Sequence, residues 1–164
     1  MVTSNQPDWS RERKVRLFEW APYKSLLGAI RTYQAWRDRK GPLAFVRWYW
    51  AFLRWRFWSV VSGASIPLRT EIGGGLQMPH CQGIVVNVGA RIGCNCDIFQ
   101  GATIGEYRGR APIIGHGVQI GPGATLLGGI TIGDGARIGP MALVMSDIPA
   151  GAAAYAPRAE IRGS

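Results

Sequence analysis

Residues 113–145 read IIGHGVQIGPGATLLGGITIGDGARIGPMALVM, and an aliphatic residue recurs at every sixth position from Ile114. The same period runs through most of the chain after Gly63, interrupted by a two-residue slip and a four-residue insertion. Glycine commonly follows the aliphatic residue, and the fifth position of the hexad is often Ala or Cys. The aliphatic positions are Ile66, Ile72, Met78 and Ile84, then Ile92, Ile98 and Ile104, and then Ile114, Ile120, Leu126, Ile132, Ile138 and Val144. A repeat at a fixed period indicates a stacked architecture.

The hexads predict short strands joined by glycine-rich corners. Each strand buries one branched side chain, turns through angles that glycine tolerates, and buries a small side chain beside the corner. Three such strands make one triangular coil, so the repeats predict about four coils stacked at the strand spacing of about 4.8 Å. We therefore expect a mainly-β fold, a parallel β-helix of hexapeptide repeats.

Composition divides the chain into two segments that meet near Ser62 and Gly63. Residues 1–58 hold twelve Lys or Arg against four Asp or Glu, all seven tryptophans and only two of the 23 glycines. The remaining residues hold seven basic against six acidic side chains. We expect an N-terminal helical, Trp/Arg-rich segment at 1–62 and a β-helix with a C-terminal tail at 63–164.

Helical spacing of apolar residues predicts two helices in the first segment. One pattern, which includes Val15, Leu17 and Phe18, runs from Lys14 to Arg39 with a break before Pro22, and a second runs from Pro42 to about Val61. The second contains Trp and Phe side chains interrupted by arginines, each of which costs about 2.5–3.5 kcal/mol inside a bilayer, so we do not expect it to span a membrane. Two interpretations stay open: residues 42–61 contact a membrane peripherally, or they cap the β-helix and pack between copies. No nucleic-acid module is visible, and we expect no such partner.

Two stretches of the second segment resemble a known family. Residues 75–86 read GLQMPHCQGIVV, and residues 99–105 read FQGATIG. They are similar to the catalytic stretch of serine acetyltransferases and related sugar and polysaccharide O-acetyltransferases, which are hexapeptide-repeat acyltransferases. The resemblance covers about residues 63–157. It implies a left-handed β-helix, a homotrimer and acetyl-CoA as the co-substrate.

The same resemblance places a catalytic histidine at His80. A hydroxyl needs a base to take its proton as it attacks a thioester, and imidazole has a suitable pKa for this task. Gln100 is the third residue of its hexad, as His80 is of its own, so we expect both on one corner of successive coils. Backbone N–H groups around Gly101 or Gly105 are candidates for stabilising the oxyanion. His116 falls on a different edge, and we expect it to be an exposed corner residue.

For acetyl-CoA, the resemblance implies a groove between neighbouring subunits along the later coils. Glycines would allow a close approach there, and a basic residue would lie near the nucleotide phosphates. The candidates by position are Gly105, Gly121, Gly123, Ala124, Arg137 and Arg158.

Departures from the serine acetyltransferase pattern concern the acceptor. Acids beside the catalytic histidine and at the start of the coil are replaced here by Pro79 and Ser65, and a second histidine is replaced by Ala111. Without these acids an ammonium group has no evident partner, which favours a neutral hydroxyl on a sugar or polysaccharide precursor. Arg108 and Arg110 could pair with an anionic glycan. A serine O-acetyltransferase is the alternative, and a non-catalytic trimeric scaffold is the alternative of another class.

Cysteine and histidine counts limit other chemistry. Three cysteines and a polar start without a secretory signal favour the cytoplasm over a disulfide framework. Cys81 is a poor nucleophile because no separate base accompanies it, and Cys96 occupies a small inward position as a core residue. Only two histidines exist, on different edges, so we expect no zinc site and no other bound metal.

Overall fold

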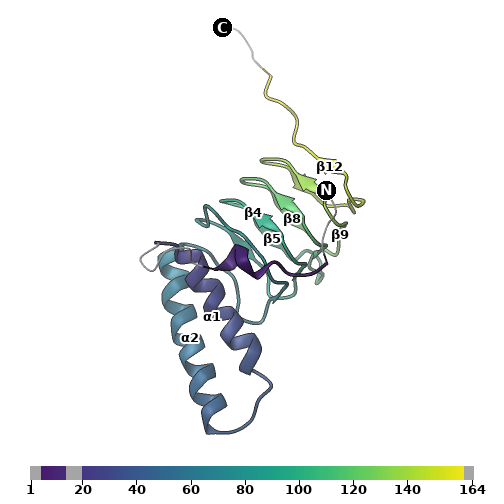
Figure 1. Ribbon diagram of the computed structural model, residues 1–164. Coiled ribbons are helices and arrows are strands. Elements are labelled where there is room, and N and C mark those ends of the chain that lie inside the picture. The colour runs from purple at the N-terminus through teal and green to yellow at the C-terminus, as the bar shows by residue number, and fades with distance from the viewer. Residues whose placement is uncertain (1–4, 14–19, 161–164) are drawn as a thin grey trace.

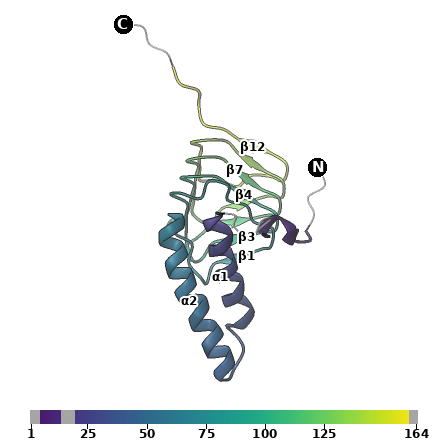
Figure 2. The ribbon, with the colours of Figure 1, turned by 60° about the vertical axis from the view of Figure 1, so that its left-hand side comes forward.

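The structure, a computed structural model, describes residues 5–13 and 20–160. A helical hairpin projects from the base of a triangular prism of short strands, and the C-terminal segment leaves the opposite end (Figures 1 and 2). The helical elements are the 3-10 helix η1 (Trp9–Glu12), α1 (Pro22–Trp36) and α2 (Pro42–Ser62). The strands are β1 (Glu71–Ile72), β2 (Val85–Val86), β3 (Arg91–Ile92), β4 (Asp97–Ile98), β5 (Thr103–Gly105), β6 (Ile113–Ile114), β7 (Gln119–Ile120), β8 (Thr125–Leu127), β9 (Thr131–Ile132), β10 (Arg137–Ile138), β11 (Leu143–Val144) and β12 (Ala153–Ala154).

The strands form three parallel sheets, one on each side of the prism. Their orders are β1-β3-β6-β9, β4-β7-β10-β12 and β2-β5-β8-β11, so each strand pairs with the strand one coil further along the chain. Isolated bridges of Ser65 with Val85 and of Ile132 with Ile148 extend the stack at both ends. This topology confirms the predicted parallel β-helix. With the isolated bridges, which include that of Gln77 with Asp97, each sheet gains a fifth rung, so the stack has about five coils and not the four that we expected.

Each two-residue strand places one side chain outward and one inward, as the hexad pattern requires. The inward residues Ile98, Ile104, Ile120 and Leu126 are completely buried. The small residues at the fifth position of the hexad, such as Cys96, are buried as well. These side chains form the core that runs along the axis of the prism. Because the strands of successive coils pair in register, their outward residues form columns on each face of the prism.

The register of the first coil differs from the one that we predicted. Val86, rather than Ile84, pairs with Ile104 and fills the aliphatic position. Gln77 pairs with Asp97, and eight residue steps lead from Gln77 to Val85 where six lead from Asp97 to Thr103. The two extra residues therefore lie in the corner before Val85, not after Ile84. Sequence periodicity could not separate the two registers because Ile84 and Val86 are both apolar, and both are buried.

The helical hairpin covers the base of the prism with its inner face. Leu26, Leu27 and Ile30 of α1 are completely buried and belong to the same hydrophobic cluster as the coils. The indole N–H of Trp55 in α2 donates a hydrogen bond of 2.7 Å to the Ile66 carbonyl. Both helices begin at the predicted prolines, and α2 ends at Ser62 with Gly63 in the left-handed region at φ 65°. The predicted helical residues Val15, Leu17 and Phe18 lie outside the described residues.

A short N-terminal segment clamps α1 to one corner of the prism. The Glu12 carboxylate accepts hydrogen bonds from the Arg31 guanidinium and from the backbone N–H groups of Gly75 and Leu76. Arg31 also donates to the carbonyl oxygens of Ile72 and Gly73. Glu12 and Arg31 neutralise each other's charge and bond the backbone N–H and C=O groups of the first coil. Those backbone groups have no coil below them to pair with.

Candidate active site

The corner between the sheet of β4 and the sheet of β2 carries His80. Met78 is buried inside the prism, whereas Pro79 and His80 are exposed and make up the two extra residues of this corner. Among the residues that the structure describes, no hydrogen bond or ion pair holds the imidazole of His80. The imidazole is thus presented to solvent on a two-residue bulge, where it is free to meet a substrate hydroxyl.

Gln82, not His80, stacks beneath Gln100, which corrects the predicted pairing. The backbone N–H of Gly101 donates to the Gln82 carbonyl, and the N–H of Gly123 donates to the Gln100 carbonyl, both at 2.9 Å. His80 and Gln100 share a corner, as expected, but His80 lies in the bulge beside the column. Because the Gly101 N–H is already bonded to Gln82, it is not available as an oxyanion donor, and this candidate was wrong.

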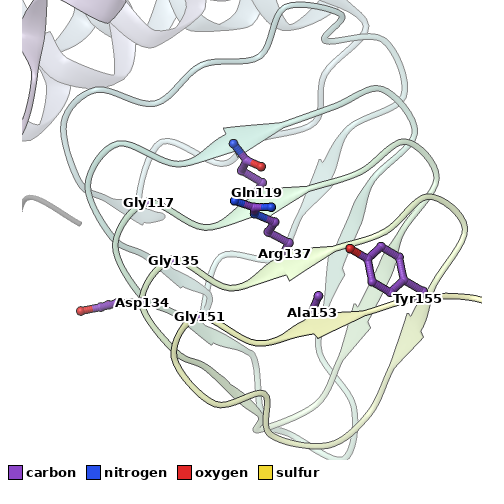
Figure 3. A pocket seen from close by; sticks show the side chains of 8 residues that line it. All are labelled: Gly117, Gln119, Asp134, Gly135, Arg137, Gly151, Ala153 and Tyr155. Atoms are coloured by element: carbon purple, nitrogen blue, oxygen red, sulfur yellow. The ribbon is translucent and has the colours of Figure 1, made fainter. Parts of the chain in front are cut away.

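A groove crosses the outer face of the sheet that contains β7 and β10. One part, about 500 Å³ in volume, is lined by Gly117, Gln119, Asp134, Gly135, Arg137, Gly151, Ala153 and Tyr155. An adjoining part of about 270 Å³ shares Gln119, Arg137 and Tyr155 and adds Phe99, Gly121, Pro122, Ile138 and Gly139. In Figure 3, Gln119 and Arg137 lie on neighbouring strands, Tyr155 flanks them, and Asp134 points away. The second part reaches the corner on which His80 lies, one coil above it at Phe99.

The structure brings together some of the predicted acetyl-CoA residues and separates others. Arg137 and Gly121 line the groove, and Gly123 follows at the same corner with φ 65°. The side chain of Ala124 is completely buried in the core, so it cannot contact a ligand. Gly105 ends β5 on another side of the prism, beneath the Leu127 side chain. Arg158 lies in the exposed segment after β12, which leads away from the prism in Figure 1. It lines neither part of the groove.

Two groove residues, Gln119 and Tyr155, were missed in the sequence. Gln119 pairs with Arg137 in the ladder and precedes the inward Ile120, just as Arg137 precedes Ile138. Because Gln119 and Arg137 hold the same position in successive hexads of one face, the repeat could have predicted that Gln119 lies beside Arg137. Tyr155 follows the last strand, where the repeat has ended, and its ring packs against Gly139. A side chain at Gly139 would meet this ring, so the exposed Tyr155 would have to move aside to admit one.

The four-residue insertion forms a tight hairpin on a different corner. Tyr107 and Arg110 exchange backbone hydrogen bonds, and the two residues between them both have positive φ, 52° at Arg108 and 73° at Gly109. This geometry is that of a two-residue hairpin turn. Both arginines line a cleft of about 440 Å³ together with Tyr107, Leu127, Gly128, Gly129, Ile130 and Met145. His80 lies before β2, whereas the cleft residues follow β5, β8 and β11 of the same sheet. Within one chain the two therefore lie at opposite ends of the strands.

The other reactive side chains have structural roles. His116 is half-buried, and its Nδ1 accepts a hydrogen bond of 3.0 Å from the Cys94 N–H, so it is not the exposed corner residue that we predicted. Burial raises the pKa of the Cys81 thiol, which donates to the Ser62 carbonyl. Burial also raises the pKa of Cys96 to about 11. A neutral thiol is a poor nucleophile. Within residues 5–13 and 20–160, no three His, Cys, Asp or Glu side chains converge as a metal site would require.

Comparison with known proteins extends this description. Residues 111–145 match the family described as bacterial transferase hexapeptide (six repeats). The serine acetyltransferase of Helicobacter pylori strain 26695 is 36% identical over 104 residues, which are 61% of each chain. Serine acetyltransferase 1 of Arabidopsis thaliana is 44% identical over 97 residues, 57% of this chain and 31% of the relative. Soybean serine acetyltransferase in complex with serine superimposes with a TM-score of 0.71 at 32% identity, over 86% of this chain and 57% of that one.

The chain therefore carries a left-handed hexapeptide-repeat β-helix and resembles the serine acetyltransferases. It spans about three fifths of the H. pylori relative and under a third of the Arabidopsis one. The relatives support the serine alternative better than the sugar or polysaccharide acceptor that the sequence departures favoured.

Proposed function

We propose that the chain is an O-acetyltransferase that moves the acetyl group of acetyl-CoA to a hydroxyl, with L-serine as the first acceptor to test. The observation that carries this proposal is the solvent-presented imidazole of His80, which lies on a bulged corner one coil below a glycine-lined groove. Similarity to serine acetyltransferases over most of the β-helix supports the reaction class.

In the proposed reaction, His80 acts as the general base. Its imidazole takes the hydroxyl proton while the acceptor oxygen bonds to the thioester carbonyl carbon. The tetrahedral intermediate collapses by breaking the carbon–sulfur bond, and the imidazolium returns the proton to the CoA sulfur. The products are an O-acetyl ester and a free thiol, so each turnover releases one thiol that can be measured.

We propose that the groove around Arg137 holds part of acetyl-CoA. Arg137 is exposed, and no carboxylate pairs with it among the described residues, so its guanidinium is available to a phosphate. The Gln119 side chain adds an amide beside it, and Gly121 and Gly139 line the adjoining part of the groove. Gln100 is exposed at the same corner as His80 and is a positioning residue in this proposal.

The acceptor is a choice between an amino acid and a neutral sugar. Serine is favoured by the relatives. A sugar hydroxyl is favoured by one observation, the absence of an acid at Pro79 and Ser65, because a serine ammonium would lack an anionic partner there. A non-catalytic scaffold is the competing explanation of another class.

We propose a homotrimer with two units, residues 1–62 and 63–164. Within one chain the His80 corner and the arginine-lined cleft at Tyr107 lie at opposite ends of the strands of one sheet, so only an assembly of chains could bring the two together. We propose a cytoplasmic location, which the three free cysteines suit, with a peripheral membrane contact through residues 42–61 that takes no part in the reaction.

The test is thiol release from acetyl-CoA by the purified chain with L-serine, with neutral sugars and nucleotide sugars, and without acceptor. We expect acceptor-dependent release with L-serine. Release with a sugar and not with L-serine would support the sugar acceptor instead. If no hydroxyl compound stimulates thiol release, the scaffold explanation is correct and the proposed enzyme is not.

A further inference from the structure

Helix α2 leaves an apolar face exposed on the side away from α1 and the prism. Only Ala44, Ala51 and Ser62 of this helix are buried. The opposite face presents six large apolar side chains, each at least 40% exposed: Leu43, Val46, Trp50, Leu53, Phe57 and Val60. Their spacing of three and four residues places them in one stripe along the whole helix. A contiguous stripe of six exposed large apolar side chains indicates a contact with another apolar phase.

Basic side chains border this apolar stripe on both flanks. Helical geometry places Arg47 and Arg54 along one edge and Arg56 along the other, and all three are exposed. On the first edge the Arg47 guanidinium stacks on the Trp36 ring of α1, 4.9 Å from its centre, and the Arg54 guanidinium lies beside Gly28 of α1. Helix α2 contains no acidic residue, and residues 21–62 hold eight Lys or Arg against a single Asp. The stripe with its two basic edges is called the α2 face below. Its charge is complementary to an anionic surface.

A second copy of α2 is a poor occupant of the α2 face. If two such helices packed antiparallel along their stripes, the positions beside the seam would bring arginine against arginine. If they packed parallel, Arg54 would face Tyr49 and Arg56 would face Val61, so no arginine would gain an acidic partner. Like charges at these positions destabilise the pair. The acidic residues that would relieve the repulsion are absent from the helix.

A bilayer surface fits the α2 face better. Indole and aromatic rings favour the boundary between headgroups and acyl chains, and arginine stems can extend from it toward the phosphates. No helix in the described part of the chain is long and apolar enough to cross a membrane. The α2 face therefore has the composition of a helix that lies in the plane of the interface.

We propose that the α2 face binds an anionic lipid membrane, with the apolar stripe inserted and Arg54 and Arg56, one from each edge, at the lipid phosphates. The inference goes beyond the proposed acetyl transfer and does not depend on it. Binding places on the membrane the helical hairpin, which projects from the prism in Figure 2. The groove and the His80 corner belong to the prism.

The experiment is cosedimentation of the full chain with vesicles of phosphatidylcholine, with and without phosphatidylglycerol. We expect binding to the anionic vesicles, and weaker binding as salt is raised. Trp50→Gln with Phe57→Gln should lower the partition coefficient about a hundredfold, because two inserted aromatic side chains are lost. Arg54→Gln with Arg56→Gln should lower it roughly fivefold for each arginine.

Conservative variants at the same positions serve as the matched controls. Trp50→Phe with Phe57→Leu keeps apolar side chains, and Arg54→Lys with Arg56→Lys keeps the charge, so both should retain most of the binding. Equal binding to neutral vesicles, or full binding by the Gln variants, would overturn the proposal. So would the absence of vesicle binding together with an oligomer that Trp50→Gln and Phe57→Gln reduce in size, since the α2 face would then be a contact between copies. Because these side chains are exposed, the variants should melt like the parent chain.

Discussion

Arg137 is the exposed cation at the centre of the groove, and its contribution can be separated from that of the fold. Because it precedes the buried Ile138 in β10, its Cα is fixed by the ladder while its side chain is free. We predict that Arg137→Gln raises the KM for acetyl-CoA about tenfold, as loss of one charged hydrogen bond would. The kcat at saturating acetyl-CoA should stay near that of the parent.

The control for this substitution is Arg91→Gln. Arg91 holds the same outward position on another face of the prism and pairs with Glu71 at the surface. Its replacement should leave the KM unchanged. Equal effects of the two substitutions would show that Arg137 acts only through the general charge of the protein.

Cys96 makes stability depend on alkaline pH. Burial raises the pKa of its thiol from 9.0 to about 11, so the folded state holds the proton more tightly than the unfolded state. The resulting stabilisation is complete below about pH 9.0 and is lost as the pH rises toward 11, in total about 2–3 kcal/mol. Denaturant unfolding across this range should show the loss in the parent chain and a smaller loss in Cys96→Ala, which fits because alanine occupies the same hexad position at Ala102. Parallel losses in both chains would contradict this prediction.

At the scale of elements, the clamp between η1, α1 and the first coil is the feature that the sequence left unpredicted. Glu12 and Arg31 lie nineteen residues apart in the chain, and Glu12 bonds both Arg31 and the N–H of Gly75. A local sequence pattern does not predict contacts between residues so far apart. Helices α1 and α2 could be predicted because Pro22 and Pro42 mark their first turns and apolar residues follow at helical spacing.

Removing the charge of the clamp should loosen the hairpin from the prism. The Glu12 and Arg31 side chains are only 10% and 17% exposed, so Glu12→Gln would leave a largely buried guanidinium without its counter-ion. We expect the free energy of unfolding to fall by about 2 kcal/mol, the contribution of a hydrogen bond to a charged group. Asp38→Asn removes the same charge from the exposed pair with Arg37 and should change stability by less than about 0.5 kcal/mol. Equal effects of the two substitutions would mean that the clamp adds no more than a surface pair.

At the scale of the whole molecule, periodicity was sufficient for the fold and insufficient for the site. Ile114, Ile120 and Leu126 had to point inward because no other register buries every sixth side chain. The choice between Ile84 and Val86 was not decided by hydrophobicity, and it was this choice that determined whether His80 stacks in a column or protrudes from it. Tyr155 lies beyond the repeat and could be placed in the groove only by the path of the chain after β12.

The exposed bulge at His80 is the point where fold and proposed chemistry meet, and one substitution tests it. Because the His80 side chain holds no other described residue in place, His80→Ala should keep the thermal midpoint of the parent chain. Acetyl-CoA thiol release at saturating acceptor should nevertheless fall by about 10²–10⁴-fold, the contribution of a positioned general base. A correctly folded His80→Ala protein that turns over at the parent rate would contradict the account.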